Sequence, residues 1–304
     1  MSLLPPVPAS RRLGQSGIEV SPLAWGMWRF RGSDADHARS LVEAALAAGI
    51  TLFDTADIYG PDNGELFGAA EALLGRVFAA APGLRQRMVL ATKGGIVIGT
   101  PYDSSASYLV AAIDASLKRL GVEQVDLWQI HRPDILTHPQ EIAGAIEKAH
   151  AQGKVRAFGV SNFTPAQVEA LMAFLPASIP LSTVQPEFSP LAIAPLDDGT
   201  LDQAVGNGLA VLAWSPLGQG RIASPGNVRE NEVAAALDAV ADEQGVSRTA
   251  AAYAWVMAHP SGAIPIVGSQ QAARIAEAAD ALKVNWTRES WYRVLVASRQ
   301  EPLP

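Results

Sequence analysis

The chain has 304 residues, a formal net charge of −7 and 49% hydrophobic residues, which is the composition of an ordinary globular protein. The acidic balance argues against a nucleic-acid-binding surface, because neutralising phosphates needs a basic stripe. The chain has no cysteine and its histidines are scattered, which predicts no disulfide and no metal site. It has no apolar run of about 18 residues and no signal-peptide pattern, which predicts a cytoplasmic protein with no membrane span.

Short runs rich in β-branched and aromatic residues, each bounded by turn residues, predict strands along the chain. Most intervals between them carry the periodicity of amphipathic helices. Thr164 and Pro165 predict the start of one such helix, as N-cap and first-turn residues. The strands are expected to begin at Leu23, Ile50, Met88, Val125, Val155, Leu181, Leu209 and Ala263. The clearest helices are expected around residues 38–46, 109–120, 142–149, 234–243, 247–258, 271–282 and 287–298, with a loop over 215–231.

The alternation of strands and helices predicts a parallel sheet with right-handed crossovers. Several strands are apolar throughout, as expected where both faces of a sheet are covered. Eight units of this length predict an α/β fold, a (β/α)₈ TIM barrel, as a single domain over residues 1–304 with two additional C-terminal helices. An open doubly wound sheet is the alternative, but the chain has neither a G-x-G-x-x-G motif nor a G-x-x-x-x-G-K-[ST] phosphate loop.

Polar side chains end several predicted strands, and in a barrel they would share the C-terminal rim, where barrel enzymes keep their active sites. Asp54, Lys93 and His131 end three successive strands, and Tyr59 follows Asp54 by five residues in the same loop. Any one of these residues alone is more often a helix cap, a solvated charge or a core histidine. Capping does not account for three of them in succession, so the rim is the predicted active site.

A phenol near an ammonium and a carboxylate can act as a proton donor. The ordinary pKa of tyrosine is about 10, and a neighbouring ammonium lowers it. We therefore expect Tyr59, Lys93 and Asp54 to form a tuned proton donor, with His131 hydrogen-bonded to the substrate oxygen. A proton delivered to a carbonyl oxygen calls for a hydride at the carbonyl carbon. Without a metal-ligand or flavin signature, a nicotinamide dinucleotide is the expected hydride source.

A series of motifs runs from residue 26 to residue 274. They read GMW, FDTADIYG, TKGG, DLWQIHRPD, GKVRAFGVSNFTP, VQPEFSPL, AWSPLGQGRI and IPIVGS. In this order they resemble the aldo-keto reductase superfamily, and most of all its bacterial YdhF-type oxidoreductases. The resemblance covers nearly the whole chain. It implies a barrel enzyme that uses NADP(H) without a Rossmann domain and acts on CH–OH and carbonyl groups.

The resemblance also implies roles for single residues. The family's catalytic tetrad falls on the four rim residues described above. The residues that hold the nicotinamide carboxamide fall on Ser161, Asn162 and Gln185, and the ring that stacks on the nicotinamide falls on Trp214. The segment 215–221 matches the one that wraps the pyrophosphate. Further cofactor contacts are implied for Gly26, Met27, Trp28, Asp54, Ser215, Leu217, Gly218, Gly220, Arg221, Gly268, Ser269, Arg274 and Glu277.

The adenosine end of the implied site departs from the family pattern. Ser269 and Arg274 match residues that hold the 2′-phosphate, and a helix starting near Gln271 would attract an anion. A basic residue that is common directly before or after this serine is replaced by Gly268 and Gln270. We therefore expect NADP(H) to be preferred by a moderate margin, with NAD(H) as the weaker cofactor.

Three functions remain in competition. The first is NADP(H)-dependent reduction of an aldehyde or ketone, or the reverse oxidation of an alcohol or sugar. The second is a non-catalytic barrel that senses the redox state of the cofactor. The third is a serine hydrolase using Ser161, His131 and an aspartate, which the lack of the second glycine of G-x-S-x-G disfavours. The expected partner is a small carbonyl compound in a fairly open pocket lined by Trp28 and Tyr102, with no nucleic acid, membrane or obligate protein partner.

Overall fold

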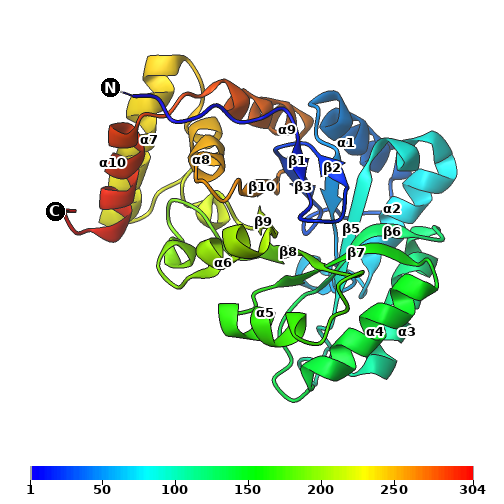
Figure 1. Ribbon diagram of the computed structural model, residues 1–304. Coiled ribbons are helices and arrows are strands. Elements are labelled where there is room, and N and C mark those ends of the chain that lie inside the picture. The colour runs from blue at the N-terminus through cyan, green and yellow to red at the C-terminus, as the bar shows by residue number, and fades with distance from the viewer. Residues whose placement is uncertain (1, 304) are drawn as a thin grey trace.

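The computed structural model describes residues 2–303, and its centre is a closed barrel of eight strands. All neighbouring strands in the barrel are parallel, and the first strand of the barrel pairs with the last (Figure 1). The predicted (β/α)₈ fold is confirmed, and each expected strand is present. The strands are β3 (Ala24–Gly26), β4 (Leu52–Asp54), β5 (Val89–Gly94), β6 (Val125–Ile130), β7 (Val155–Ser161), β8 (Leu181–Gln185), β9 (Ala210–Ala213) and β10 (Ile264–Val267).

The helices surround the barrel (Figure 1). All of them except α2, α6 and α9 begin after a residue whose side chain caps the first turn. Thr164 and Gln167 form a capping box at the start of α5, as the Thr164-Pro165 pair predicts. The expected loop 215–231 is shorter than predicted, because Asn227 caps α7 and the helix begins at Val228. The helices are α1 (Ala35–Ala47), α2 (Ala69–Ala80), α3 (Ala106–Leu120), α4 (Pro139–Ala151), α5 (Pro165–Met172), α6 (Thr200–Asn207), α7 (Val228–Gln244), α8 (Arg248–Met257), α9 (Ala272–Ala278) and α10 (Arg288–Arg299).

A short antiparallel hairpin precedes the barrel and was not predicted. Its strands are β1 (Arg11–Arg12) and β2 (Glu19–Val20). Leu13 and Ile18 of this hairpin are buried in one cluster with the inward-facing residues of the barrel. A Cβ atom on Gly14 would lie 2.4 Å from the carbonyl oxygen of Ser182, so the hairpin fits closely against the start of β8. The hairpin therefore covers the amino-terminal end of the barrel, opposite the predicted site.

The barrel interior changes character from one end to the other. Near the hairpin it is filled by small and branched apolar side chains such as Leu52, Ala91 and Leu127. Toward the carboxyl ends of the strands the buried side chains become polar, as at Lys93 and Gln129, which are register partners in β5 and β6. A larger apolar cluster fills the layer between strands and helices. The rim is thus the part of the barrel where buried polar chemistry is concentrated.

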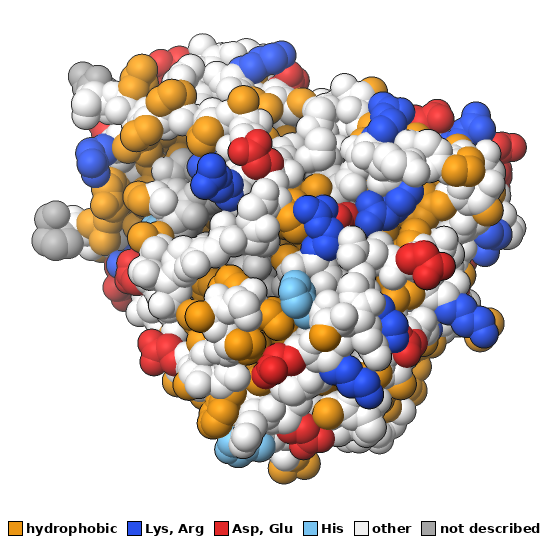
Figure 2. Space-filling view, turned by 45° about the vertical axis from the view of Figure 1, so that its right-hand side comes forward, with side chains coloured by type: hydrophobic (Ala, Val, Ile, Leu, Met, Phe, Trp, Pro, Cys, Tyr) orange, Lys and Arg blue, Asp and Glu red, His pale blue; other side chains and the backbone are white. Residues whose placement is uncertain are grey.

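The surface carries both signs of charge. On the face shown in Figure 2, basic and acidic side chains are interspersed and form no continuous basic stripe. Within residues 2–303, no helix is both long and apolar enough to cross a bilayer. In the same part of the chain, no group of three or more His, Asp or Glu side chains is arranged to hold a metal ion.

Candidate active site

A buried ion pair forms the base of the site. The Lys93 Nζ atom lies 2.6 Å from Asp54 Oδ2 and donates a second hydrogen bond of 2.8 Å to the carbonyl oxygen of Thr55. Asp54 ends β4 and Lys93 lies in the adjacent strand β5, so strand pairing brings the two side chains together. Because both side chains are buried, each charge depends on the other for stabilisation.

The second carboxylate oxygen of Asp54 accepts hydrogen bonds from two buried amides. Gln129 Nε2 lies 3.3 Å away and Gln185 Nε2 lies 3.2 Å away. Gln129 also accepts a 3.0 Å hydrogen bond from Thr183 Oγ1, so a polar chain crosses the barrel interior below the rim. Gln129 was not predicted, although a glutamine in the otherwise apolar strand β6 was a visible signal. Gln185, expected at the carboxamide, here orients Asp54.

Tyr59 and His131 lie directly beside this pair. Lys93 Nζ is 5.1 Å from the centroid of the Tyr59 ring, and the rings of Tyr59 and His131 meet edge to face with centroids 5.8 Å apart. Tyr59 is fixed by its own backbone, whose carbonyl oxygen accepts a hydrogen bond from the N–H of Ala70 at the start of α2. The structure therefore brings Asp54, Tyr59, Lys93 and His131 together on one rim.

The prediction that the pKa of Tyr59 is lowered is wrong. Burial raises the pKa of Tyr59 above its usual value, and this effect outweighs the lowering by the Lys93 ammonium, while the Asp54 carboxylate also acts to raise it. Burial would lower the pKa of Lys93, but Asp54 and Tyr59 outweigh burial and raise it. The phenol is therefore protonated and the ammonium charged at neutral pH, which is the state required of a proton donor.

His131 is neutral at the same pH. Burial, with smaller contributions from the cations of Lys93 and Arg132, holds the pKa of His131 well below its usual value. Its Nδ1 atom is buried and has no hydrogen-bond partner among residues 2–303. A neutral imidazole carries one N–H donor, so His131 can offer a hydrogen bond to a substrate oxygen without bringing a third charge to the rim.

The residues expected at the carboxamide form a connected set at the ends of β7 and β8. Ser161 Oγ donates a 2.9 Å hydrogen bond to the carbonyl oxygen of Gln185. Asn162, which adopts a positive φ of 61°, donates from Nδ2 to Ser161 Oγ at 2.8 Å and to the carbonyl oxygen of His131 at 3.2 Å. Trp214 Nε1 donates to Asn162 Oδ1 at 3.0 Å. This network fixes the plane of the Trp214 indole relative to the site.

Arg132 is a rim residue that sequence reasoning missed. Its guanidinium carbon lies 5.8 Å from the centroid of the Trp214 ring, and its charge reaches both Tyr59 and His131. No carboxylate of residues 2–303 forms an ion pair with it. Its position directly after His131 in the HRPD string was the available signal. A guanidinium without a protein partner at a site is suited to binding oxygen atoms of a ligand.

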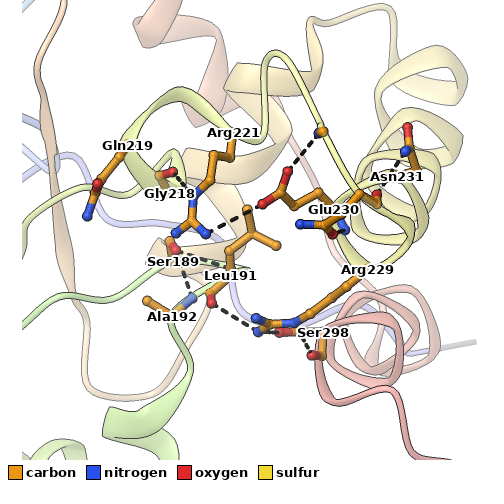
Figure 3. A network of polar contacts seen from close by, with 12 residues as sticks. Ser189, Leu191, Ala192, Gly218, Gln219, Arg221, Arg229, Glu230, Asn231 and Ser298 are labelled. Carbon is orange, nitrogen blue, oxygen red and sulfur yellow. Dashed lines mark hydrogen bonds and ion pairs between the residues drawn. The ribbon is translucent and has the colours of Figure 1, made fainter.

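The loop after β9 is tied down by a polar network, shown in Figure 3. Arg221 Nε donates to the carbonyl oxygen of Gly218 at 2.8 Å, and Arg221 Nη1 lies 3.4 Å from Glu230 Oε1. The other oxygen of Glu230 accepts a 2.7 Å hydrogen bond from the N–H of Gly226. A Cβ atom on Gly218 would lie 2.9 Å from a methyl group of Leu191, so the loop approaches its neighbour closely. The implied contact of Arg221 with the pyrophosphate remains a prediction.

The turn after β10 is anchored to the first strand of the barrel. Trp25 Nε1 donates to the carbonyl oxygen of Ser269 at 2.9 Å, and Gln270 Nε2 donates to that of Gly26 at 3.0 Å. Arg274 lies on the first turn of α9, as predicted. The predicted helix 271–282 is α-helical only to Ala278 and continues as a 3₁₀ turn.

Three further residues of the predicted site lie at its edges. Glu277 Oε1, expected at the adenine, accepts a 3.0 Å hydrogen bond from Thr249 Oγ1. The pocket residues Trp28 and Tyr102 are 42% and 39% exposed, so neither is a core residue.

The chain is similar to known reductases and oxidoreductases. The sequence model described as "Aldo/keto reductase family" matches residues 22–296. Over the full length of both chains the protein is 62% identical to a 6-dehydroglucose reductase of Novosphingobium aromaticivorans. It is 39% identical to a 6-dehydroglucose reductase of Agrobacterium fabrum, over 91% of this chain and 94% of that one. It is 37% identical to the oxidoreductase YdhF of Escherichia coli, over 96% and 98%. A solved structure of the thermostable aldo-keto reductase Tm1743 superposes with a TM-score of 0.80 at 23% identity, covering 95% of this chain and 99% of that one.

Proposed function

The chain belongs to the aldo/keto reductase family and is an oxidoreductase, and we propose that it reduces an aldehyde with NADPH, using Tyr59 as the proton donor. The observation that carries the proposal is the buried Asp54–Lys93 pair beside Tyr59 and His131 on one rim. No other part of the barrel rim combines an ionisable donor, a buried cation and a neutral imidazole within residues 2–303.

Each of the four rim residues has a separate role in protonating the substrate oxygen. NADPH, when bound, supplies the hydride to the carbonyl carbon. His131 donates a hydrogen bond to the carbonyl oxygen, and Tyr59 gives its phenolic proton to the same oxygen as negative charge develops there. Lys93 stabilises the phenolate that remains, and Asp54 holds the ammonium in place. Burial raises the pKa of Tyr59 further above neutral pH, so the phenol holds the proton that reduction requires.

The residues of the rim fit a nicotinamide dinucleotide. Ser161 and Asn162 offer polar groups for the carboxamide, and the Trp214 indole offers an apolar face for the ring. Gln270 Oε1 is buried without a partner among the described residues, beside Ser269 and near the expected adenosine end. Arg274 supplies a positive charge there, which supports NADP(H) over NAD(H).

We further propose that the substrate is a sugar aldehyde of the 6-dehydroglucose type. Two relatives bear that activity in their names, one of them 62% identical across the entire chain. Arg132 supports the proposal, because a guanidinium that forms no ion pair with any of residues 2–303 can bind several sugar hydroxyls.

The test is turnover by the full-length protein. Consumption of NADPH, followed by its absorbance, is measured with 6-dehydroglucose and with a generic aromatic aldehyde. We expect Tyr59→Phe to lower kcat by at least about 10²-fold, the usual effect of losing a general acid, with cofactor affinity nearly unchanged. Tyr292→Phe, on the exposed surface of α10, is the matched control and should behave as wild type. NADPH binding without turnover of any carbonyl would instead support a redox-sensing barrel.

A further inference from the structure

A second guanidinium at the rim has no assigned role. Arg29 lies in the loop after β3, and no hydrogen bond or ion pair within residues 2–303 engages its side chain. Its guanidinium carbon lies 4.5 Å from the centroid of the Trp28 ring. That indole is itself held, because Trp28 Nε1 donates to Asp62 Oδ2 at 3.1 Å and the Trp28 carbonyl oxygen accepts from Asn63 Nδ2 at 2.6 Å. Arg29 is thus an unpaired cation on an ordered aromatic platform.

The guanidinium of Arg29 lies against Gly268, at the end of β10. A Cβ atom on Gly268 would lie 3.8 Å from Arg29 Nη1, and no other heavy atom comes within 4 Å of that position. Gly268 does not adopt a positive φ, so its backbone does not require glycine. The space in front of Gly268 is therefore open except for the guanidinium of Arg29.

The position of Arg29 can compensate for the basic residue that is missing beside Ser269. The resemblance to the family leads one to expect a basic side chain directly before or after Ser269, and those positions are Gly268 and Gln270. Gln270 cannot supply the charge, and its amide is already bonded to the carbonyl oxygen of Gly26. Pairing of β10 with β3 brings Arg29, 239 positions away in sequence, to the side of Gly268.

We propose that Arg29 replaces the missing basic residue and binds the ribose 2′-phosphate of NADP(H) together with Ser269 and Arg274. The proposal rests on the proposed function, in which NADP(H) is the cofactor. A dianionic phosphate is best held by more than one charge-assisted hydrogen bond. Arg29 lies in the loop after β3 with its guanidinium beside Gly268, and Arg274 lies on the first turn of α9, which follows the turn at Ser269. NADH lacks this phosphate, so Arg29 contributes to cofactor choice.

The experiment measures binding to the cofactor-free, full-length protein by calorimetry. The ligands are NADPH, NADH and adenosine 2′,5′-bisphosphate, which lacks the pyrophosphate and the nicotinamide. We expect Arg29→Ala to weaken NADPH and the bisphosphate on the order of tenfold, because a hydrogen bond to a charged group contributes about 1.4 kcal/mol or more. NADH affinity should change by less than about twofold. Arg12→Ala, which removes one exposed charge from the hairpin at the opposite end of the barrel, is the control.

A rescue variant separates the charge from the structure of the loop. Arg29→Ala/Gly268→Lys returns a basic side chain to the position that the family uses, where the backbone and the emptied space admit it. We expect it to restore most of the NADPH affinity, while Arg29→Ala/Gly268→Leu does not. Thermal unfolding of each variant verifies that it is folded.

Two results would overturn the proposal. Equal losses of NADPH and NADH affinity would assign Arg29 to the pyrophosphate or to loop structure, and an unchanged NADPH affinity would assign it no cofactor contact. Both leave the proposed function standing, since the wild-type protein still binds NADPH. If the wild-type protein binds neither dinucleotide, the proposed function fails and the inference fails with it.

Discussion

The buried pair of Asp54 and Lys93 predicts a strong energetic coupling. The Lys93 side chain is fully buried and that of Asp54 is 3% exposed, so removing either charge leaves the other unpaired in the barrel. Breaking such a pair typically lowers the free energy of unfolding by about 3–5 kcal/mol. At this chain length, that loss corresponds to roughly 5–8 °C in Tm. We expect both Lys93→Met and Asp54→Asn to show it.

The double variant Asp54→Asn/Lys93→Met removes both charges and leaves neither unpaired. Its loss of stability should therefore be smaller than the sum of the single losses, by about 2 kcal/mol or more. Thermal unfolding of the four cofactor-free proteins, followed by circular dichroism, measures the cycle. Arg39→Ala, which breaks an exposed pair with Glu43 on α1, is the control and should change stability by about 1 kcal/mol or less. Additive losses, or a Lys93→Met protein as stable as wild type, would refute the reasoning.

Three other outcomes are expected. Reduction needs the protonated phenol of Tyr59, and burial raises the pKa of that phenol, so kcat for reduction should not fall as pH rises from neutral into the mildly alkaline range. Alcohol oxidation needs the phenolate and should accelerate as pH rises. A reduction rate that halves near neutral pH would contradict this. NADP⁺ should quench the protein fluorescence, and Trp214→Leu should lose much of that quenching, unless Trp214 serves only packing. Arg274→Ala should weaken NADPH by roughly 10- to 150-fold and leave NADH almost unchanged. Equal loss of both cofactors would instead make Arg274 a support of α9.

The sequence predicted the barrel because its signal is repeated along the chain. Each strand is a short apolar run, and each helix between strands presents an apolar face, so errors at element ends do not change the fold class. The hairpin of β1 and β2 was missed because its strands have two residues each, too few for a periodic pattern. The hairpin is held in place by its contacts with side chains inside the closed barrel, and these contacts exist only in the complete fold.

The site was predictable to the extent that its residues follow strands. Asp54 ends β4, Lys93 is the last residue but one of β5 and His131 directly follows β6, so parallel pairing brings all three to the same rim. The direction of the Tyr59 pKa shift was not predictable, because it depends on the balance between burial and the nearby ammonium. Gln129 was missed because it lies within β6, whose mostly apolar sequence is typical of a core strand. The proximity of Arg29 to Gly268 depends on barrel closure and has no trace in local sequence.

The pairing of β3 with β10 has a consequence for folding. It joins segments near opposite ends of the chain, and the hydrogen bond from Trp25 to Ser269 spans 244 positions. Contacts of such separation in sequence are slow to form, because a long loop must close before they add any stability. During synthesis, β3 to β9 emerge while the sheet still has two open edges, which are prone to wrong pairing. The turn at Ser269 can take its place beside β3 only after almost the whole chain has been made, so a protein truncated before β10 would have no closed barrel.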